Sequence, residues 1–452
     1  MNDFHACADA FAYPACIQAN DGTAWPGAAI GAAVTRALEL TRAPAATAEA
    51  LSIRADPLPL QTPSADVAVL SFAGSLLMLA CLFAVVVGSA MWMSGRARGL
   101  SWQASPQTRW LDGLRGLAVT LVLLNHAPLV LLNLQLAPTG FTLSAETREL
   151  LDYLGSIGVQ IFFCITGCLF AHKLLPAQRV DWALFFVRRA QRLMPAYVVA
   201  VVAALVVAGI FSRIDRHFIA SALDAIPRLM AFGFYPLPRV GALETSRLLG
   251  MSWTLAFEWR FYVVLPLVFM VIRLGKAPGS VAITLVTVVL MMVEGLGVWM
   301  FFALGALMAP LARWEPTPAQ RGWMRVALHV CMGSLLLNWV VVDQDRVLQG
   351  LHVLALFACV AVTRPRWLSS HGAVALGTLS YSLYLLHVMV FFAVFGVCHA
   401  YFFDVAALSP VAFTLLASMA VMLVMAISAL TYLLLERRFI DFNPRPEPRP
   451  VR

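Results

Sequence analysis

Residues 111–134, "LDGLRGLAVTLVLLNHAPLVLLNL", decide the fold class because most of the stretch is apolar enough to cross a lipid bilayer. The same stretch carries Arg115 near its start and His126 in its middle. Ionisable groups inside a membrane span are costly and usually serve a function. The stretch therefore predicts a transmembrane helix and, within it, part of a functional site.

The composition extends this prediction to the whole chain. Of the 452 residues, 61% are hydrophobic and 12% are charged, and a soluble domain would carry about twice that charged fraction. The apolar runs are continuous, unlike the alternating strands of a membrane barrel. We predict an all-α, polytopic transmembrane helical bundle with about ten core helices plus one extra N-terminal transmembrane helix. The expected spans are 67–93, 113–134, 157–175, 195–211, 251–272, 280–293, 298–312, 326–342, 349–363, 376–398 and 410–434.

Four segments follow from this pattern. Residues 1–65 form a loosely ordered extracytoplasmic tail, and residues 66–106 hold the extra transmembrane helix and a cytoplasmic linker. Residues 107–440 form the main membrane domain, and residues 441–452 form a disordered cytoplasmic tail. Cys7 and Cys16 lie in the N-terminal tail, and the sequence leaves open whether they form a disulfide.

The loops indicate an orientation. If residues 94–112 are cytoplasmic and the sides alternate, the cytoplasmic segments hold about twice as many Lys and Arg residues as the others. This bias predicts an outside N-terminus, a cytoplasmic C-terminus and a multi-pass protein of the plasma (inner) membrane. It also explains the net charge of +8 without nucleic-acid binding.

Arg115 and His126 are expected on one face of their helix. Their separation corresponds to about 16 Å of rise and to a rotation about 20° beyond three full turns. Arg115 would lie at the cytoplasmic edge and His126 about halfway across the bilayer core. One face of the helix would thus carry both an anion-binding group and a base. The alternative is that His126 only forms a hydrogen bond to a neighbouring helix.

A second polar stretch, "FFVRRAQRLMPAY" (185–197), places Arg188, Arg189 and Arg192 at the cytoplasmic end of a span, where Pro195 fits a helix start. Arg189 and Arg192 are neighbours on one helix face. They suit a clamp for phosphates, because a guanidinium binds phosphate with two parallel hydrogen bonds. Ordinary anchoring by positive charge on the cytoplasmic side explains the cluster equally well.

Two further stretches carry polar groups inside spans. In "GMSWTLAFEWRFYVVLPL" (250–267), Glu258 is the stronger functional candidate, while Arg260 needs a separate partner. Trp253 and Tyr262 suit an interfacial or substrate-contacting position. In "LGTLSYSLYLLHVMVFF" (376–392), the candidates are Ser380, Tyr381 and His387, although a Ser hydroxyl often bonds only its own helix.

Together these stretches resemble the acyltransferase-3 family of integral membrane O-acyltransferases over residues 107–440. The resemblance rests on six motifs in order: "LDGLRGLAVTLVLLNHA", "GVQIFFCITGCLF", "RRAQRLMPAY", "WTLAFEWRFY", "SYSLYLLH" and "LERRFI". The departures are Thr166, Cys168, Arg260, and Val388 with Met389, which stand where the family usually has Ser, Phe, Gln and Trp-Pro.

The resemblance implies transfer of an acyl group, usually acetyl, from acyl-CoA to a hydroxyl of a cell-surface glycan or its lipid-linked precursor. Acetyl-CoA or another acyl-CoA would be the co-substrate, and no metal is predicted. We expect Arg115, Arg189 and Arg192 to hold the CoA phosphates and His126 to act as general base, with Glu258 beside it in the chemistry. The residues expected to orient the acceptor are Trp253, Tyr262, Ser380, Tyr381 and His387.

Several alternatives stay open at this point. A transporter or flippase of a glycan or other polar substrate would also place polar groups in many spans, although no repeat symmetry is visible. A purely structural scaffold fits the cost of the ionisable groups less well. The acyl group could pass directly to the acceptor or by way of an acyl-enzyme. The sequence names neither the acceptor nor the acyl length, and it leaves open whether the protein forms a homo-oligomer.

Overall fold

A computed structural model of the chain describes residues 67–96, 108–174, 177, 179–274, 296–312, 314–341 and 346–442. The chain divides into two compact units, Met1–Gln61 and Thr62–Arg452, and all described residues belong to the second. The predicted N-terminal tail, nearly all of the C-terminal tail, the span expected at 280–293, and Cys7 and Cys16 lie outside the described residues.

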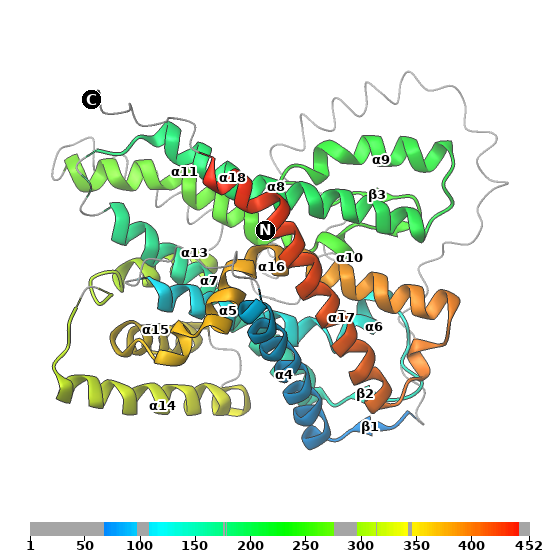
Figure 1. Ribbon diagram of the computed structural model, residues 1–452, viewed down its shortest axis with the longest axis horizontal. Coiled ribbons are helices and arrows are strands. Elements are labelled where there is room, and N and C mark those ends of the chain that lie inside the picture. Colours follow the sequence, from blue (N-terminus) through cyan, green and yellow to red (C-terminus); the bar gives the residue numbers. More distant parts are fainter. Residues whose placement is uncertain are drawn as a thin grey trace. The chain divides into compact units, whose positions relative to one another are not determined.

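The described residues are mostly helical (Figure 1). The α-helices are α4 (Phe72–Arg96), α5 (Arg109–His126), α6 (Val130–Leu134), α7 (Ala145–Leu174), α8 (Trp182–Ile210), α9 (Arg216–Leu229), α10 (Ser246–Leu249), α11 (Ser252–Leu274), α13 (Leu296–Leu307), α14 (Pro318–Val341), α15 (Arg346–Thr363), α16 (His371–Tyr401), α17 (Pro410–Thr431) and α18 (Arg437–Asp441). Two 3-10 helices, η3 (Arg366–Ser369) and η4 (Val405–Ala407), and one π-helix, η5 (Tyr432–Glu436), join them. The strands form two short pairs: β1 (Val69–Leu70) is parallel to β2 (Thr142–Leu143), and β3 (Arg239–Val240) is antiparallel to β4 (Leu243–Glu244).

Within the described residues, 6 helices are long and apolar enough to cross a membrane. They span Phe72–Gly95, Ala145–Leu174, Trp182–Ile210, Ser252–Arg273, His371–Tyr401 and Pro410–Asp441. Two shorter apolar helices, Val298–Leu307 and Gly350–Thr363, accompany them. The predicted all-α class is confirmed, and six of the expected spans (67–93, 157–175, 195–211, 251–272, 376–398 and 410–434) each overlap one of these long apolar helices. The expected spans at 113–134 and 326–342 are helical but are not among the six, and the described residues do not decide the total number of spans.

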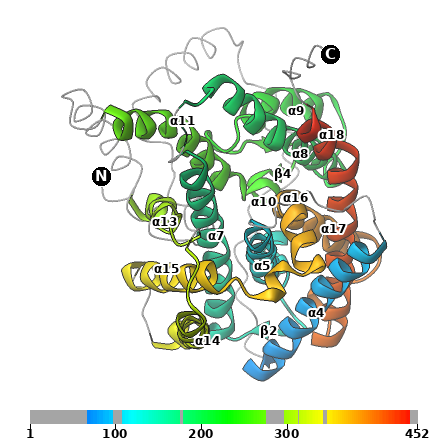
Figure 2. The ribbon, with the colours of Figure 1, turned by 60° about the vertical axis from the view of Figure 1, so that its left-hand side comes forward.

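Helix α5, which contains the opening stretch, packs against α16 on one side and α7 on the other (Figure 2). Glycines allow the backbones to approach closely. A Cβ atom added to Gly377 of α16 would lie 1.7 Å from the carbonyl oxygen of Asp112, and one added to Gly158 of α7 would lie 2.7 Å from that of Ala118. Because small residues let membrane helices pack backbone to backbone, these positions fix α5 between its two neighbours.

Two predicted helix boundaries were wrong. Helix α8 begins at Trp182, where the Asp181 side chain accepts a hydrogen bond from the backbone N–H of Leu184 at 3.0 Å, and Pro195 lies inside the helix. A membrane helix tolerates an interior proline, so the arginine run is helical and does not precede the helix. Helix α5 ends at His126, because Pro128 cannot donate the next helical hydrogen bond, and α6 continues the chain separately.

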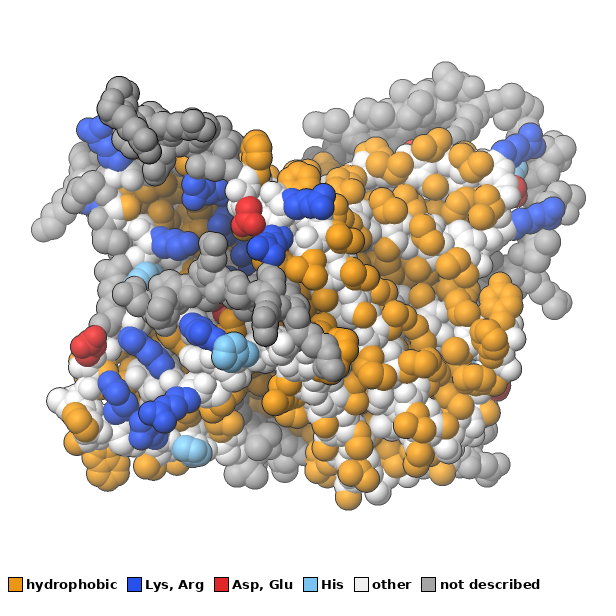
Figure 3. All heavy atoms as spheres, viewed as in Figure 1, with side chains coloured by type: hydrophobic (Ala, Val, Ile, Leu, Met, Phe, Trp, Pro, Cys, Tyr) orange, Lys and Arg blue, Asp and Glu red, His pale blue; other side chains and the backbone are white. Residues whose placement is uncertain are grey.

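The extra N-terminal helix α4 packs against α17, α16 and α5. Exposed apolar side chains, such as Leu77, Trp92, Val411 and Leu415, extend along α4 and α17. Figure 3 shows that hydrophobic side chains cover much of the visible face of the molecule in the region of these two helices, while Lys and Arg gather elsewhere. An extended exposed apolar surface of this kind suits contact with lipid.

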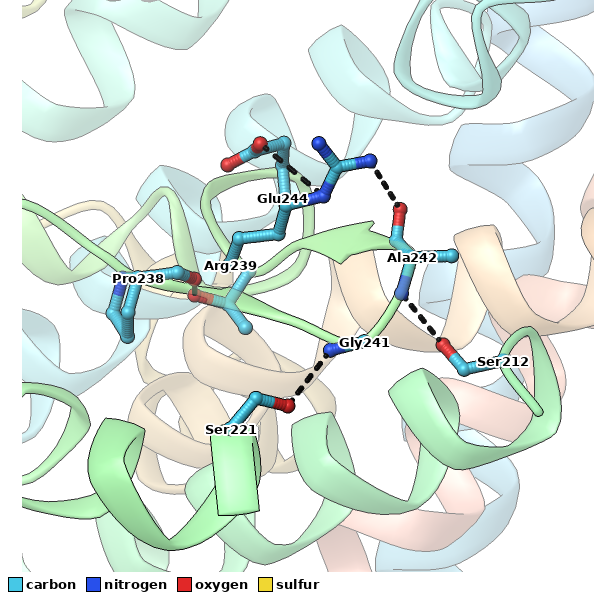
Figure 4. A network of polar contacts seen from close by, with 8 residues as sticks. Ser212, Ser221, Pro238, Arg239, Gly241, Ala242 and Glu244 are labelled. Carbon is cyan, nitrogen blue, oxygen red and sulfur yellow. Dashed lines mark hydrogen bonds and ion pairs between the residues drawn. The ribbon is translucent and has the colours of Figure 1, made fainter. Parts of the chain in front are cut away.

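The segment between α8 and α11 folds into an ordered lobe (Figure 4). The β3–β4 hairpin is tied to its surroundings by two serines: the Ser221 hydroxyl accepts from Gly241 N–H at 3.1 Å, and the Ser212 hydroxyl accepts from Ala242 N–H at 3.0 Å. Arg239 pairs with Glu244 at 3.8 Å. Helix α9 (Arg216–Leu229) supplies Ser221 to this network.

Candidate active site

A cavity among α5, α7, α8, α11 and α16 brings the separate polar stretches of the sequence together. The space inside it is about 640 Å³, part of which is open solvent. Five predicted site residues line it: Arg115, Arg192, Glu258, Ser380 and Tyr381. The remaining lining residues are Val159, Phe162, Phe163, Thr166, Leu193, Thr254, Leu255 and Tyr384.

One end of the cavity is strongly basic. Arg115 of α5 interacts electrostatically with Arg192 of α8 and with Glu258 of α11, and its Nη1 lies 3.7 Å from Oδ1 of Asp112. Lys173, in the last turn of α7, interacts with Arg115, Arg192 and two further arginines of α8. Cations from three helices therefore converge where anionic groups of a ligand would bind.

Arg189 lies beside the cavity lining. Its guanidinium carbon is 5.4 Å from the ring centroid of Phe170 and 6.0 Å from that of Tyr262. Its Nε is buried and has no hydrogen-bond partner among the described residues. Arg188, one position earlier, is exposed. Within the arginine run, Arg192 lines the cavity, Arg189 packs against two aromatic rings without lining it, and Arg188 is exposed.

Glu258 lies at the basic end of the cavity and accepts a hydrogen bond from the Tyr262 hydroxyl. Tyr262 is 1% exposed and does not line the cavity. Trp253 also lies outside the lining, and its ring contacts Phe257 at a centroid distance of 5.9 Å. The location of Tyr262 thus suits orientation of Glu258 better than stacking on a sugar or anchoring at a membrane interface.

The two predicted histidines contact each other, and neither of them lines the cavity. The rings of His126 (α5) and His387 (α16) are 4.9 Å apart between centroids in an edge-to-face arrangement. Tyr384 lines the cavity one helical turn before His387, and its hydroxyl accepts from Thr254 Oγ1 at 3.0 Å. The ring centroid of Tyr384 is 6.1 Å from that of His387, so Tyr384 connects the cavity lining to the histidine pair.

The hydrogen bonds of the pair define which nitrogen is basic. His126 Nδ1 is 2.9 Å from the carbonyl oxygen of Val122, and His387 Nδ1 is 2.8 Å from that of Tyr384. A carbonyl only accepts, so in each neutral ring Nδ1 carries the hydrogen and Nε2 is left with a free lone pair. The Nε2 of His387 is buried and has no hydrogen-bond partner among the described residues. Both histidines therefore offer an acceptor nitrogen, as a general base requires.

Several residues of the site were missed from the sequence. Lys173 was counted only as a loop charge, and Thr254 and Tyr384 have no unusual pattern in an apolar segment. Their involvement depends on which helices pack together. Within the described residues, no group of three or more His, Cys, Asp or Glu side chains could hold a metal ion.

Fold and site together define a helical membrane domain with a polar cavity inside it. Residues 108–430 match the family model described as an acyltransferase domain, so the chain belongs to the acyltransferase-3 family. The predicted family is thus confirmed, and with the long apolar helices it makes the chain an integral membrane protein. The family match favours a transferase over the transporter alternative.

Several curated proteins are similar to parts of the chain. A putative peptidoglycan O-acetyltransferase of Bacillus subtilis (strain 168), YrhL, is 32% identical over 170 residues, which cover 36% of this chain and 23% of the relative. A putative O-acetyltransferase of Staphylococcus aureus (strain COL) is 26% identical over 352 residues, covering 65% of this chain and 52% of the relative. The O-acetyltransferase OatA of Staphylococcus aureus (strain NCTC 8325 / PS 47) is 26% identical over 321 residues, covering 61% and 49%. The matches thus span about half or less of each relative's length, and no solved structure matches.

Proposed function

We propose that this protein transfers an acyl group, in the simplest case acetyl, from acyl-CoA to a hydroxyl of a cell-surface or exported glycan or its lipid-linked precursor. The observation that carries the proposal is a cavity that is lined by Arg115 and Arg192 and whose lining residue Tyr384 lies next to the histidine pair. The O-acetyltransferase names of the relatives support the class of acceptor chemistry.

The basic end of the cavity would bind the donor. Arg115 and Arg192 line it, and the buried Nε of the nearby Arg189 has no hydrogen-bond partner among the residues that the structure describes. Charge-assisted bonds from guanidinium groups to the CoA phosphates would fix the donor with its thioester directed toward the histidines. Glu258, held by Tyr262, would orient Arg115 and so act on the donor side. Glu258 would therefore not act beside His126, as the sequence suggested. Among the described residues, the ring in contact with His126 is that of His387.

The transfer itself requires one base. Nε2 of His126 would take the proton of the acceptor hydroxyl while the hydroxyl oxygen attacks the carbonyl carbon of the thioester. The carbon–sulfur bond then breaks, and the CoA thiolate leaves and takes up the proton. His387 would orient the acceptor by accepting a hydrogen bond at Nε2, and it would orient His126 through the edge-to-face ring contact. Ser380 and Tyr381 would contact the substrate from the cavity wall.

The orientation expected from the basic loops fits this chemistry. A cytoplasmic C-terminus and an outside N-terminus place Arg188–Arg192 on the side where acyl-CoA occurs, and the acceptor would approach from the opposite side. We infer a plasma-membrane location on the same ground.

Transfer from radiolabelled acetyl-CoA into glycan, by the purified protein in lipid nanodiscs, tests the proposed function. Label in the glycan that depends on His126 would support it, and donor that is neither bound nor consumed would refute it. Incubation without acceptor separates the two routes. Covalent label on the protein that is lost in His126→Ala would indicate an acyl-enzyme, whereas no protein-bound label would support direct transfer.

A further inference from the structure

A second cavity, at the ends of α5, α7 and α15 and the loop before α14, takes no part in the chemistry described so far. The space inside it is about 800 Å³, part of which is open solvent. The polar part of its lining consists of Thr108, His172, Glu315 and Arg364. These residues bring a hydroxyl, an imidazole, a carboxylate and a guanidinium to one cavity. Such a mixture suits a ligand with several kinds of polar group better than a simple anion.

The second cavity follows the candidate active site along two helices. On α5, Leu111 lines the second cavity and Arg115 lines the first, about 6 Å further along the helix. On α7, Leu169 lines the second cavity, and Thr166, three residues away, lines the first. Residues three or four apart lie on the same face of a helix. A long ligand that lies along this face of α5 and α7 therefore reaches both cavities.

The backbone of Arg364 has a conformation that favours glycine. Arg364 directly follows the last residue of α15, and its φ of 44° lies in the left-handed region. Glycine is the usual residue at such a helix end, because a side chain is strained there. The strain indicates that the guanidinium of Arg364 contributes something that glycine could not.

Two backbone carbonyls hold this guanidinium at the cavity wall. Nη2 of Arg364 donates to the carbonyl oxygen of Ala312 at 2.6 Å, and Nε donates to that of Ala361 at 3.2 Å. These bonds use two of the five N–H groups of a guanidinium, and a phosphate can bind to others, such as those on Nη1. The two carbonyls therefore fix the group in place without using up its capacity to bind an anion.

The donor of the proposed function fits two successive cavities. Acyl-CoA is a long molecule with its thioester at one end and a diphosphate, adenine and a separate 3′-phosphate toward the other. Arg115 and Arg192 of the first cavity would bind the diphosphate. We infer that the second cavity binds the 3′-phosphoadenosine end of the donor, with Arg364 on the 3′-phosphate. Glu315 then accepts a hydrogen bond from the adenine amino group or from a ribose hydroxyl. This inference rests on the proposed function.

The test compares the affinities of acetyl-CoA and acetyl-3′-dephospho-CoA for the purified protein in lipid nanodiscs. The wild type should bind acetyl-CoA roughly 10 to 150 times more tightly, which is the effect of one charge-assisted bond. Arg364→Gly, which suits the left-handed backbone, should lose this preference. Its affinity for acetyl-CoA should fall by the same factor, and its affinity for the dephospho ligand should stay that of the wild type. Arg366→Ala removes an equal charge from an exposed site outside the cavity lining and should behave like the wild type.

Two outcomes would overturn the inference. One is an Arg364→Gly protein that keeps the wild-type preference for acetyl-CoA, since Arg364 would then have only its structural bonds to the two carbonyls. The other is a wild-type protein that binds the two ligands equally well. If Arg364→Gly does not fold, Arg364→Lys decides by the same comparison and should reduce the preference, because lysine lacks the planar fork of donors. Failure of the proposed function looks different, since the wild type would then bind neither ligand.

Discussion

Replacing Arg192 with Ala should weaken acyl-CoA binding without unfolding the protein. Arg192 lines the cavity together with Arg115, so its loss would remove one charge-assisted contact to the donor phosphates. Such a contact contributes about 1.5–3 kcal/mol, which corresponds to a dissociation constant roughly 10 to 150 times higher. Lys at this position should restore only part of the affinity, because it lacks the planar fork of donors.

Arg188→Ala is the matched control for this prediction. Arg188 lies in the same turn of α8, carries the same charge and would contribute equally to a simple topology signal, but it is exposed and does not line the cavity. Its replacement should change binding by less than about 0.5 kcal/mol, as for other surface positions. Isothermal titration with acetyl-CoA and a melting curve of each variant give both quantities. Equal affinities of Arg192→Ala and Arg188→Ala would refute the donor site and leave the arginine run as an anchoring signal.

Three further outcomes are expected. His126→Ala should bind acetyl-CoA normally but lose transfer. His126→Gln should not restore transfer, because an amide cannot take a proton. An active His126→Ala protein would show that this residue is not part of the chemistry. Gly377→Ala should lower the unfolding free energy by about 1–3 kcal/mol or more, since its Cβ would meet the Asp112 carbonyl oxygen, whereas Gly88→Ala has nothing within 4 Å and should be tolerated; equal melting temperatures of the two variants would contradict the close packing. Cysteine labelling in intact cells should reach residues 212–250 from outside and residues 436–452 only after the membrane is opened, and the opposite pattern would reverse the orientation.

The sequence predicted the parts of the site better than their arrangement. Arg115 and His126 were placed on one face from helical geometry alone, which holds because α5 is continuous between them. The four polar stretches were each identified by the cost of an ionisable group in an apolar span. These are local properties, and local properties can be read from a single segment.

What could not be predicted depends on packing between helices. The contact of His126 with His387 requires the close approach of α5 and α16 at Gly377, which no single segment shows. Helix α7 begins at Ala145, well before the span predicted at 157–175. Its first turns are polar, so hydropathy does not detect them as part of a membrane helix. The π-turn η5, in which Glu436 is buried, also has no sequence signature of its own.

The central claim is that this protein acylates a glycan hydroxyl with His126 as the base. Mass spectrometry of the cell-surface glycans tests it most directly, in cells that lack the gene and in cells in which the wild-type or the His126→Ala gene is restored. The wild-type gene should add the mass of an acyl group, in the simplest case acetyl, to a glycan component, and the His126→Ala gene, at equal protein level, should not. Glycan masses that are identical with and without the wild-type gene would contradict the claim.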